Sequence, residues 1–153
     1  MKEKLDEIVF EGHPNVTGLH RNTIEVTKDS EISKKADCII GVNATKSCAD
    51  LNMSLKDWIR SGSWLEFEIT VGVQSFTFEG RGSPKLDLTD KRELVLRKSD
   101  YASSRTAALN CSYSARDLPR ALVSRLKDPA AEGKLIFRSL PRPKTDSFVW
   151  TLP

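Results

Sequence analysis

Hydrophobic and polar residues alternate over several short segments of the chain, which is the pattern of β-strands that bury one face. The clearest case is residues 65–73, in which every second residue is hydrophobic and the residues between are polar or small. Similar alternation, or a run of β-branched residues, predicts strands at 7–12, 23–27, 38–42, 93–97, 106–110 and 134–139, with one more inside 74–88. Strands therefore make up most of the expected structure.

Two other segments carry hydrophobic residues at helical spacing, so that they line up on one face of a helix. The first helix is expected to begin at Asp50, whose carboxylate can cap it, and to end at Gly62, which can adopt the left-handed conformation. The second is expected to begin at Asp117, to accept Pro119 in its first turn and to end at Asp128. The hydrophobic stripes are Leu51, Leu55, Trp58 and Ile59 in the first helix and Leu118, Leu122 and Leu126 in the second.

The chain also resembles itself at an offset of 67 to 70 residues. The order of strands and helix is the same in both segments, so we expect an internal duplication with repeats at about 7–73 and 75–140. A chance match between two segments of β-α-β pattern is the alternative. The remaining tail, 141–153, is expected to add an edge strand at Phe148–Trp150 or to dock as an end. The aligned pairs include Phe10-Glu11-Gly12 with Phe78-Glu79-Gly80, Val42-Asn43 with Leu109-Asn110, and Asp50-Leu51 with Asp117-Leu118.

Together these elements predict one domain over residues 1–153 with an α+β, β-rich fold. Two pseudo-symmetric, strand-rich repeats with one helix each would share a single sandwich- or barrel-like core. The strands exclude an all-helical bundle, and their consecutive order argues against a doubly wound parallel sheet. A chain of 153 residues can bury such a core without a disulfide or a metal.

The composition is that of a globular protein, with 39% hydrophobic and 29% charged residues. No hydrophobic run approaches the ~20 residues of a membrane span, and the charged N-terminal segment lacks the hydrophobic stretch of a signal peptide. The three cysteines form no CxxC pair, so we expect no disulfide framework and a reducing, cytoplasmic location. No membrane partner is expected, and the oligomeric state is left open.

Charge is distributed unevenly between the two halves of the chain. Residues 1–74 contain 9 Lys and Arg against 12 Asp and Glu, whereas residues 75–153 contain 15 against 9. A basic half can present a positive field to phosphate groups. The alternative is that the charges are scattered over a solvated surface, or that the two halves attract each other.

The strongest candidate for an anion site is the segment of Arg97, Lys98 and Asp100, with Arg105 a few residues further on. Arg can bind a phosphate or carboxylate through two hydrogen bonds, and Lys acts as a point charge. A pseudo-twofold arrangement would bring this loop and its counterpart in the first repeat to one cleft. A surface ion-pair cluster with little energetic weight is the alternative.

Both histidines, His13 and His20, lie in one polar segment next to Arg21. Imidazoles in such a segment can act as metal ligands, as general bases or as hydrogen-bond donors to phosphate. Together with Asp37 and Cys38 they match no standard zinc spacing, so we expect no metal site and no cofactor. Cys38 is expected to be a core cysteine, and the sequence contains no phosphate-binding loop or nucleophile motif.

These residues lead to three hypotheses, and they leave open whether the protein is an enzyme. The first is a binding protein for a phosphate-bearing ligand, nucleotide-like or nucleic acid. The second is a small hydrolase or lyase in which His20 is the general base, Asp37 orients it and Lys98 stabilises negative charge. The third is a protein-partner module that uses a sheet edge and the tail. The ligand-binding residues in the first hypothesis are His13, Arg21, Arg97, Lys98, Asp100 and Arg105, with His20 beside them.

Four ordered motifs, at residues 12–16, 20–27, 37–44 and 97–106, resemble an archaeal protein family known as domain of unknown function 371. The resemblance implies an archaeal source, a cytoplasmic location and a mainly β, sandwich-like fold, and it brings no activity, substrate or cofactor. The chain departs from the family pattern at Asn110-Cys111-Ser112-Tyr113-Ser114. The positions that match the family are His13, His20, Arg21, Asp37, Asn43, Lys98, Asp100 and Arg105.

Overall fold

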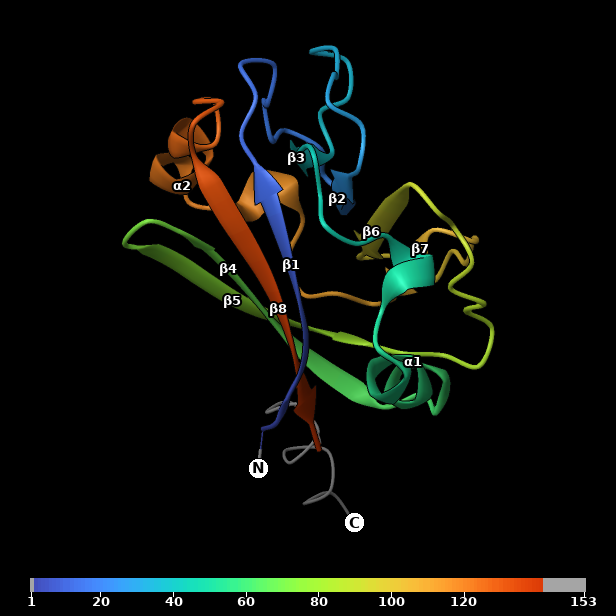
Figure 1. Ribbon diagram of the computed structural model, residues 1–153. Helices are drawn as coiled ribbons and strands as arrows, with labels where there is room; N and C mark the ends of the chain where they lie inside the picture. Colours follow the sequence, from blue (N-terminus) through green and yellow to red (C-terminus); the bar gives the residue numbers. More distant parts are fainter. Residues whose placement is uncertain (1, 142–153) are drawn as a thin grey trace.

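The structure, a computed structural model, describes residues 2–141, and within them the chain forms two four-stranded sheets and two α-helices (Figure 1). The longer sheet is antiparallel and has the strand order β1 (Lys4–Glu11), β8 (Glu132–Leu140), β4 (Trp64–Val71) and β5 (Gln74–Arg81). The shorter sheet has the order β3 (Ile39–Gly41), β2 (Thr23–Thr27), β6 (Glu93–Arg97) and β7 (Thr106–Ala108). In it the central pair is antiparallel and both outer pairs are parallel. The predicted β-rich α+β class is confirmed.

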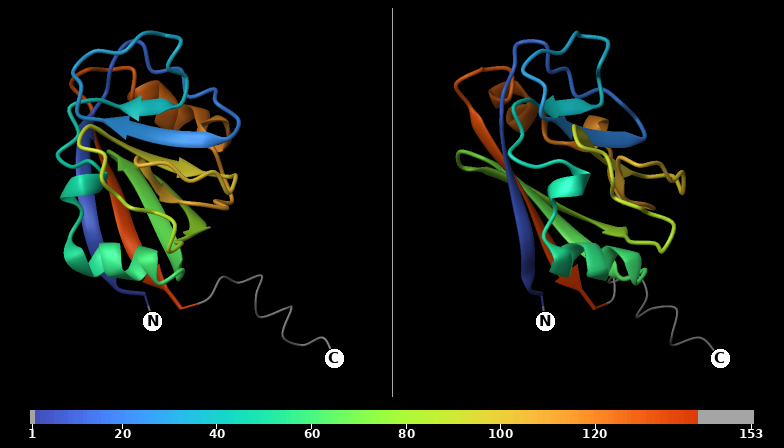
Figure 2. Two further views of the ribbon diagram at one scale, coloured as in Figure 1. Left: turned by 90° about the vertical axis from the view of Figure 1, so that its right-hand side faces the viewer. Right: turned by 45° about the vertical axis from the view of Figure 1, so that its right-hand side comes forward.

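The two sheets pack against each other around one hydrophobic core, so the fold is a sandwich and not a closed barrel (Figure 2). Alternate residues of β4 are buried, as the sequence pattern predicts for a strand with one dry face. Phe67 lies at the centre, with its ring 5.1 Å from that of Phe78 and 5.6 Å from that of Phe137. The shorter sheet adds buried aliphatic side chains to the same core, namely Ile24, Val26, Leu94 and Leu96.

Each α-helix begins later than the sequence predicts, because a 3-10 turn precedes it. The turn η1 (Cys48–Asp50) leads into α1 (Met53–Arg60), and η2 (Ala115–Asp117) leads into α2 (Arg120–Arg125). The residues between turn and helix are extended, so the predicted hydrophobic stripe is divided between two short elements. Gly62 has a φ of 79° just after α1, which confirms its left-handed conformation at the helix end.

Strands from the two halves of the chain alternate across the longer sheet. β1 and β4 belong to the first half, whereas β5 and β8 belong to the second. Because β1 pairs with β8, β8 with β4 and β4 with β5, every pairing in this sheet joins one half to the other. β2 and β6 join the halves again at the centre of the shorter sheet. The two halves therefore share one core and one set of hydrogen bonds.

Several local features recur in the two halves. Asn43 and Asn110 have φ angles of 51° and 52°, and each follows the short parallel strand of its half. Isolated bridges link Glu11 to Val42 and Arg81 to Leu109. These correspondences agree with the alignment of the two segments, and the internal duplication itself stays a prediction. The predicted edge strand at 148–150 lies outside the described residues.

Candidate functional site

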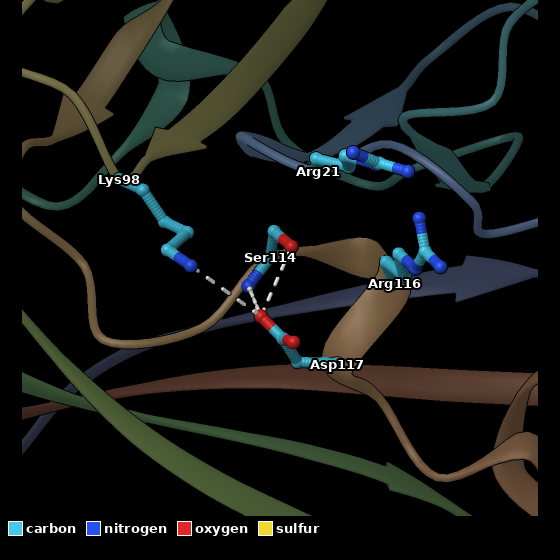
Figure 3. Close-up of a pocket in the computed structure, with 5 residues that line it drawn as sticks. All are labelled: Arg21, Lys98, Ser114, Arg116 and Asp117. Atoms are coloured by element: carbon cyan, nitrogen blue, oxygen red, sulfur yellow. Dashed lines mark hydrogen bonds and ion pairs between the residues drawn. The ribbon is translucent and has the colours of Figure 1, made fainter.

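A cationic pocket lies where the loop before β2, the end of β6 and η2 meet (Figure 3). Its volume is about 360 Å³. The side chains that line it are Arg21, Lys98, Ser114, Arg116 and Asp117. We call it the cationic pocket below.

Backbone hydrogen bonds hold the three segments of the cationic pocket together. The N–H of Lys98 donates to the carbonyl of Asn22 at 2.8 Å, which joins the end of β6 to the loop carrying Arg21. The N–H of Arg116 donates to the carbonyl of His20 at 3.0 Å, which joins η2 to the same loop. The loop is shaped by the imidazole of His20, whose Nδ1 accepts hydrogen bonds from the N–H groups of Asn22 and Thr23, both at 3.1 Å. Arg21 is thus fixed between two anchored neighbours.

Ser114 and Asp117 form the capping box of η2. Asp117 Oδ2 accepts hydrogen bonds from the N–H of Ser114 at 2.8 Å and from its hydroxyl at 3.1 Å. The bond from the Ser114 N–H is the main reason that the pKa of Asp117 lies below its usual value, and the charge of Lys98 lowers it further. Lys98 Nζ lies 3.8 Å from the same oxygen, so an ionised Asp117 positions the Lys98 amine.

The cationic pocket holds three cations and one carboxylate. Among residues 2–141, Arg21 and Arg116 have no carboxylate within the 4.0 Å of an ion pair. In Figure 3 the guanidinium of Arg116 extends from η2 toward the Arg21 side chain, and Lys98 approaches from the opposite side. Two like charges that face each other favour an anion between them. The arrangement can therefore bind a group with several negatively charged oxygens.

The structure brings together only part of the predicted anion site. Arg21 and Lys98, 77 positions apart in the sequence, both line the cationic pocket. Arg97, the last residue of β6, lies elsewhere because successive residues of an extended chain point to opposite faces of a sheet. Arg105 lies in the loop before β7 and does not line the pocket. Arg97 Nε donates to Thr106 Oγ1 at 2.7 Å, and its guanidinium lies 5.0 Å from the centre of the Tyr101 ring.

Arg105 is engaged by two carboxylates. Its Nη1 lies 2.8 Å from Glu93 Oε1 and 3.4 Å from Glu25 Oε2, in a cluster on the shorter sheet. Glu25 is buried, and burial is the main reason that its pKa is raised to about 7, with the charge of Glu93 acting in the same direction. The Arg105 charge is balanced within the protein, which makes it a poor candidate for binding an external anion.

His13 and Asp100 also lie apart from the cationic pocket. His13 lines a separate pocket of about 500 Å³, where its Nε2 lies 3.1 Å from Glu31 Oε1 and its Nδ1 accepts the N–H of Asn15 at 3.0 Å. Asp100 is exposed in the loop that follows β6. Neither residue lines the cationic pocket.

The geometry around His20 shows how the predicted acid–base residues are used. Three groups already surround Nδ1, since Thr23 Oγ1 lies 2.9 Å from it in addition to the two backbone donors. Asp37 meets this loop through its backbone carbonyl, which accepts the N–H of Leu19 at 3.1 Å and that of His20 at 3.2 Å. These contacts build the loop that carries Arg21. The hydrolase or lyase hypothesis stays a prediction, and so does the protein-partner module.

Sequence reasoning missed Arg116 as a site residue and treated Asp117 only as a helix cap. The signal was present in the alignment of the two segments, where Ser47 and Asp50 correspond to Ser114 and Asp117. The same register places Ala49 opposite Arg116. A cation present in only one of two otherwise similar turns, here Arg116, can indicate a binding site that a search for known motifs does not find.

Within residues 2–141, no group of three or more His, Cys, Asp or Glu side chains could hold a metal ion. The cysteines Cys38, Cys48 and Cys111 are free thiols. Burial is the main cause that raises the pKa of Cys38, to about 12, so its thiol is a weak nucleophile. None of the helices in this part of the chain has the length and hydrophobicity of a membrane span.

The fold and the pocket define a small two-sheet sandwich protein with a cationic pocket between a loop, a strand end and a 3-10 turn. The family model described as Domain of unknown function (DUF371) matches residues 8–139, and the chain belongs to this family. It is also 37% identical over 132 residues to the Uncharacterized protein MJ0206 of the archaeon Methanocaldococcus jannaschii, an alignment that covers 86% of this chain and 95% of that protein. The resemblance seen in the sequence motifs is confirmed.

Proposed function

We propose that this protein binds a phosphate-bearing ligand, nucleotide-like or part of a nucleic acid, in the cationic pocket. The observation that carries the proposal is the pair Arg21 and Arg116, which share the pocket with Lys98 and lack a carboxylate partner among residues 2–141. A guanidinium presents parallel N–H donors that match two phosphate oxygens. A volume of about 360 Å³ is at the small end of ligand pockets, which suits a phosphate with a small substituent.

Each residue has a defined part in the proposed site. Arg21 and Arg116 bind the phosphate oxygens, and Lys98 adds a point charge from the side of β6. Asp117 holds Lys98 and closes the capping box, so one of the three positive charges is balanced and the pocket retains an excess of two. A phosphate group with a charge near −2 would balance this excess.

The internal duplication belongs to the same proposal, because it explains why only the second half would bind. At the matching turn of the first half, Lys28 Nζ lies 2.6 Å from Asp50 Oδ2, and Ala49 replaces the arginine. This ion pair is shorter than the 3.8 Å contact between Lys98 and Asp117. The counterpart turn therefore lacks the excess charge that supports binding. A phosphate bound at this counterpart turn would contradict this part of the proposal.

Titration calorimetry with inorganic phosphate and adenosine monophosphate tests the proposal. The wild type should bind one equivalent, and ligand at 100 times its dissociation constant should stabilise the fold by about 2.7 kcal/mol. Arg21→Gln and Arg116→Gln should each weaken binding about tenfold or more, since each removes a charged hydrogen-bond donor to phosphate. Both side chains are exposed, so the fold should tolerate the changes.

The matched control is Lys91→Gln, which removes an exposed cation at the position that aligns with Arg21. Its affinity should equal that of the wild type. Absence of phosphate and nucleotide binding in the wild type would overturn the proposal. An equal loss in the control would show that net charge, and not the cationic pocket, determines binding.

We also propose a cytoplasmic location. The three free thiols, Cys38, Cys48 and Cys111, support a reducing compartment. Thiol alkylation in freshly lysed source cells should label all three residues under denaturing conditions, and a disulfide found there would contradict this location.

A further inference from the structure

The cationic pocket is one end of a longer basic surface, which we call the α2 surface. It consists of η2, α2 and the start of β8, and it ends at a second pocket of about 470 Å³ beside the turn between β4 and β5. Figure 1 shows α2 close to the start of β8 and above that turn. The cations on it beyond the cationic pocket are Arg120, Arg125, Lys127 and Lys134.

Among residues 2–141, none of these four cations forms an ion pair, although Asp128 and Glu132 lie on the same surface. α2 has the sequence RALVSR, which contains no acidic residue. Arg120 donates to the backbone carbonyls of Gly18 at 3.1 Å and Ala115 at 2.9 Å, and Lys127 donates to that of Val16 at 2.7 Å. A carbonyl orients a cation without cancelling its charge, so both residues keep their positive field.

Arg125 and Lys134 line the second pocket, together with Thr70 and the backbone of Gly72. Neither cation has a carboxylate within ion-pair distance in the described part of the chain. Glu132 also lines this pocket and is exposed. Like the cationic pocket, the second pocket therefore contains more cations than carboxylates, but it has two cations in place of three.

The corresponding surface of the first half is different. α1 contains Asp57, and the turn before it holds Asp50 in an ion pair with Lys28. Of the 15 basic residues in the second half of the sequence, six lie on the α2 surface, namely Lys98, Arg116, Arg120, Arg125, Lys127 and Lys134. A surface with two cationic pockets joined by unbalanced arginines fits a ligand with several phosphates in a row.

We propose that the α2 surface binds the sugar-phosphate backbone of a single-stranded nucleic acid, with one phosphate in the cationic pocket and others along α2 to the second pocket. This inference rests on the proposed function, and it names the ligand class. A single strand is favoured over a duplex because its flexible backbone can turn into a pocket of about 360 Å³, whereas a stiff duplex cannot. Backbone contacts of this kind bind without reading the base sequence.

Fluorescence anisotropy with a labelled single-stranded RNA of about eight nucleotides tests the inference. The logarithm of the association constant should fall linearly with the logarithm of salt concentration. The double variant Arg125→Gln, Lys134→Gln should weaken binding of the RNA and reduce the slope by about 1.4, since two phosphate contacts are lost. The same variant should bind adenosine monophosphate like the wild type, because the cationic pocket is intact.

A matched control is Lys34→Gln, Lys35→Gln, which removes two exposed cations from another loop and should leave the affinity for RNA unchanged. An unchanged affinity and slope for RNA in the Arg125→Gln, Lys134→Gln variant would overturn the inference. The proposed function would still be supported if the wild type binds adenosine monophosphate and Arg116→Gln does not. If the wild type binds no monophosphate, the proposed function fails. The RNA measurements then test by themselves whether the α2 surface binds RNA. Tighter binding of a duplex of the same length would overturn the assignment to single strands.

Discussion

At the residue scale, Glu25 is a buried carboxyl group whose surroundings favour its neutral form. Only 3% of its side chain is exposed, and Glu93, Arg105 and the Cys38 thiol are its charged or titratable neighbours. Cys38 Sγ donates to Glu25 Oε1 at 3.4 Å. One arginine shared by two carboxylates does not fully offset the cost of burying a charge, so the protonated form of Glu25 is favoured.

A pH dependence of stability follows from this residue. Between pH 4.5 and about 7 the folded protein keeps the Glu25 proton, whereas the unfolded chain releases it. The free energy of unfolding should therefore fall as pH rises through this window, by about 3 kcal/mol at most, and stay lower above it. Glu25→Gln should remove the dependence, so the variant should gain stability relative to the wild type between pH 4 and pH 8.

Urea denaturation at pH 4 and at pH 8 measures the free energy of unfolding of the variant and the wild type. Glu31→Gln is the control, because the Glu31 side chain is 85% exposed. A stability difference between Glu25→Gln and wild type that does not change with pH would show that folding leaves the pKa of Glu25 unshifted.

At the element scale, the two 3-10 turns have the same construction, and η2 with its N-cap residue supplies three of the residues that line the cationic pocket, Ser114, Arg116 and Asp117. Each turn is closed by a Ser and an Asp three positions apart, and the carboxylate accepts from the serine N–H and hydroxyl. Sequence analysis located the capping carboxylates Asp50 and Asp117 and assigned them to α-helices. The local sequence alone does not distinguish a turn followed by an extended residue pair from the first turn of a helix.

Removing the serine hydroxyl from η2 should destabilise the fold. Ser114→Ala removes one hydrogen bond to Asp117 and should cost about 1 kcal/mol, within the range of N-cap substitutions. Because Asp117 positions Lys98, the variant should also weaken binding of phosphate. Thermal and urea denaturation give the stability, with the exposed Ser104→Ala as a control that should change it by less than about 0.5 kcal/mol. Equal effects of the two substitutions would show that the capping box contributes nothing.

At the scale of the whole molecule, the two halves are intertwined in a way that prevents either from completing a sheet. All three strand pairings of the longer sheet cross from one half to the other. Two glycines lie at close contacts between the halves. Gly12 packs against the carbonyl of Leu126 after α2, and Gly82 packs against that of Ile59 in α1. A strand of each half thus packs closely against the helical segment of the other half.

Separate halves of the chain should therefore not fold. We expect residues 1–73 and 74–153, expressed as two fragments, to give circular dichroism and NMR spectra of unfolded chains, because the strands of the longer sheet in each fragment lack all of their partners. Mixing them at high concentration should restore a folded species with the spectrum of the intact chain. A fragment that folds cooperatively as a monomer would show that the pairing across halves is not required.

The amino-acid sequence by itself determined the strands, the balance of strands and helices and the family, because alternation and turn residues are local signals. β2 and β6 lie where the pattern predicts them, and Gly62 ends its helix as expected. Only the tertiary structure decided which cations meet. Arg21, Lys98 and Arg116 come from three segments joined by backbone hydrogen bonds, whereas Arg97 and Arg105 have their contacts elsewhere. Local periodicity does not encode the pairing of distant strands, which depends on packing across the whole core.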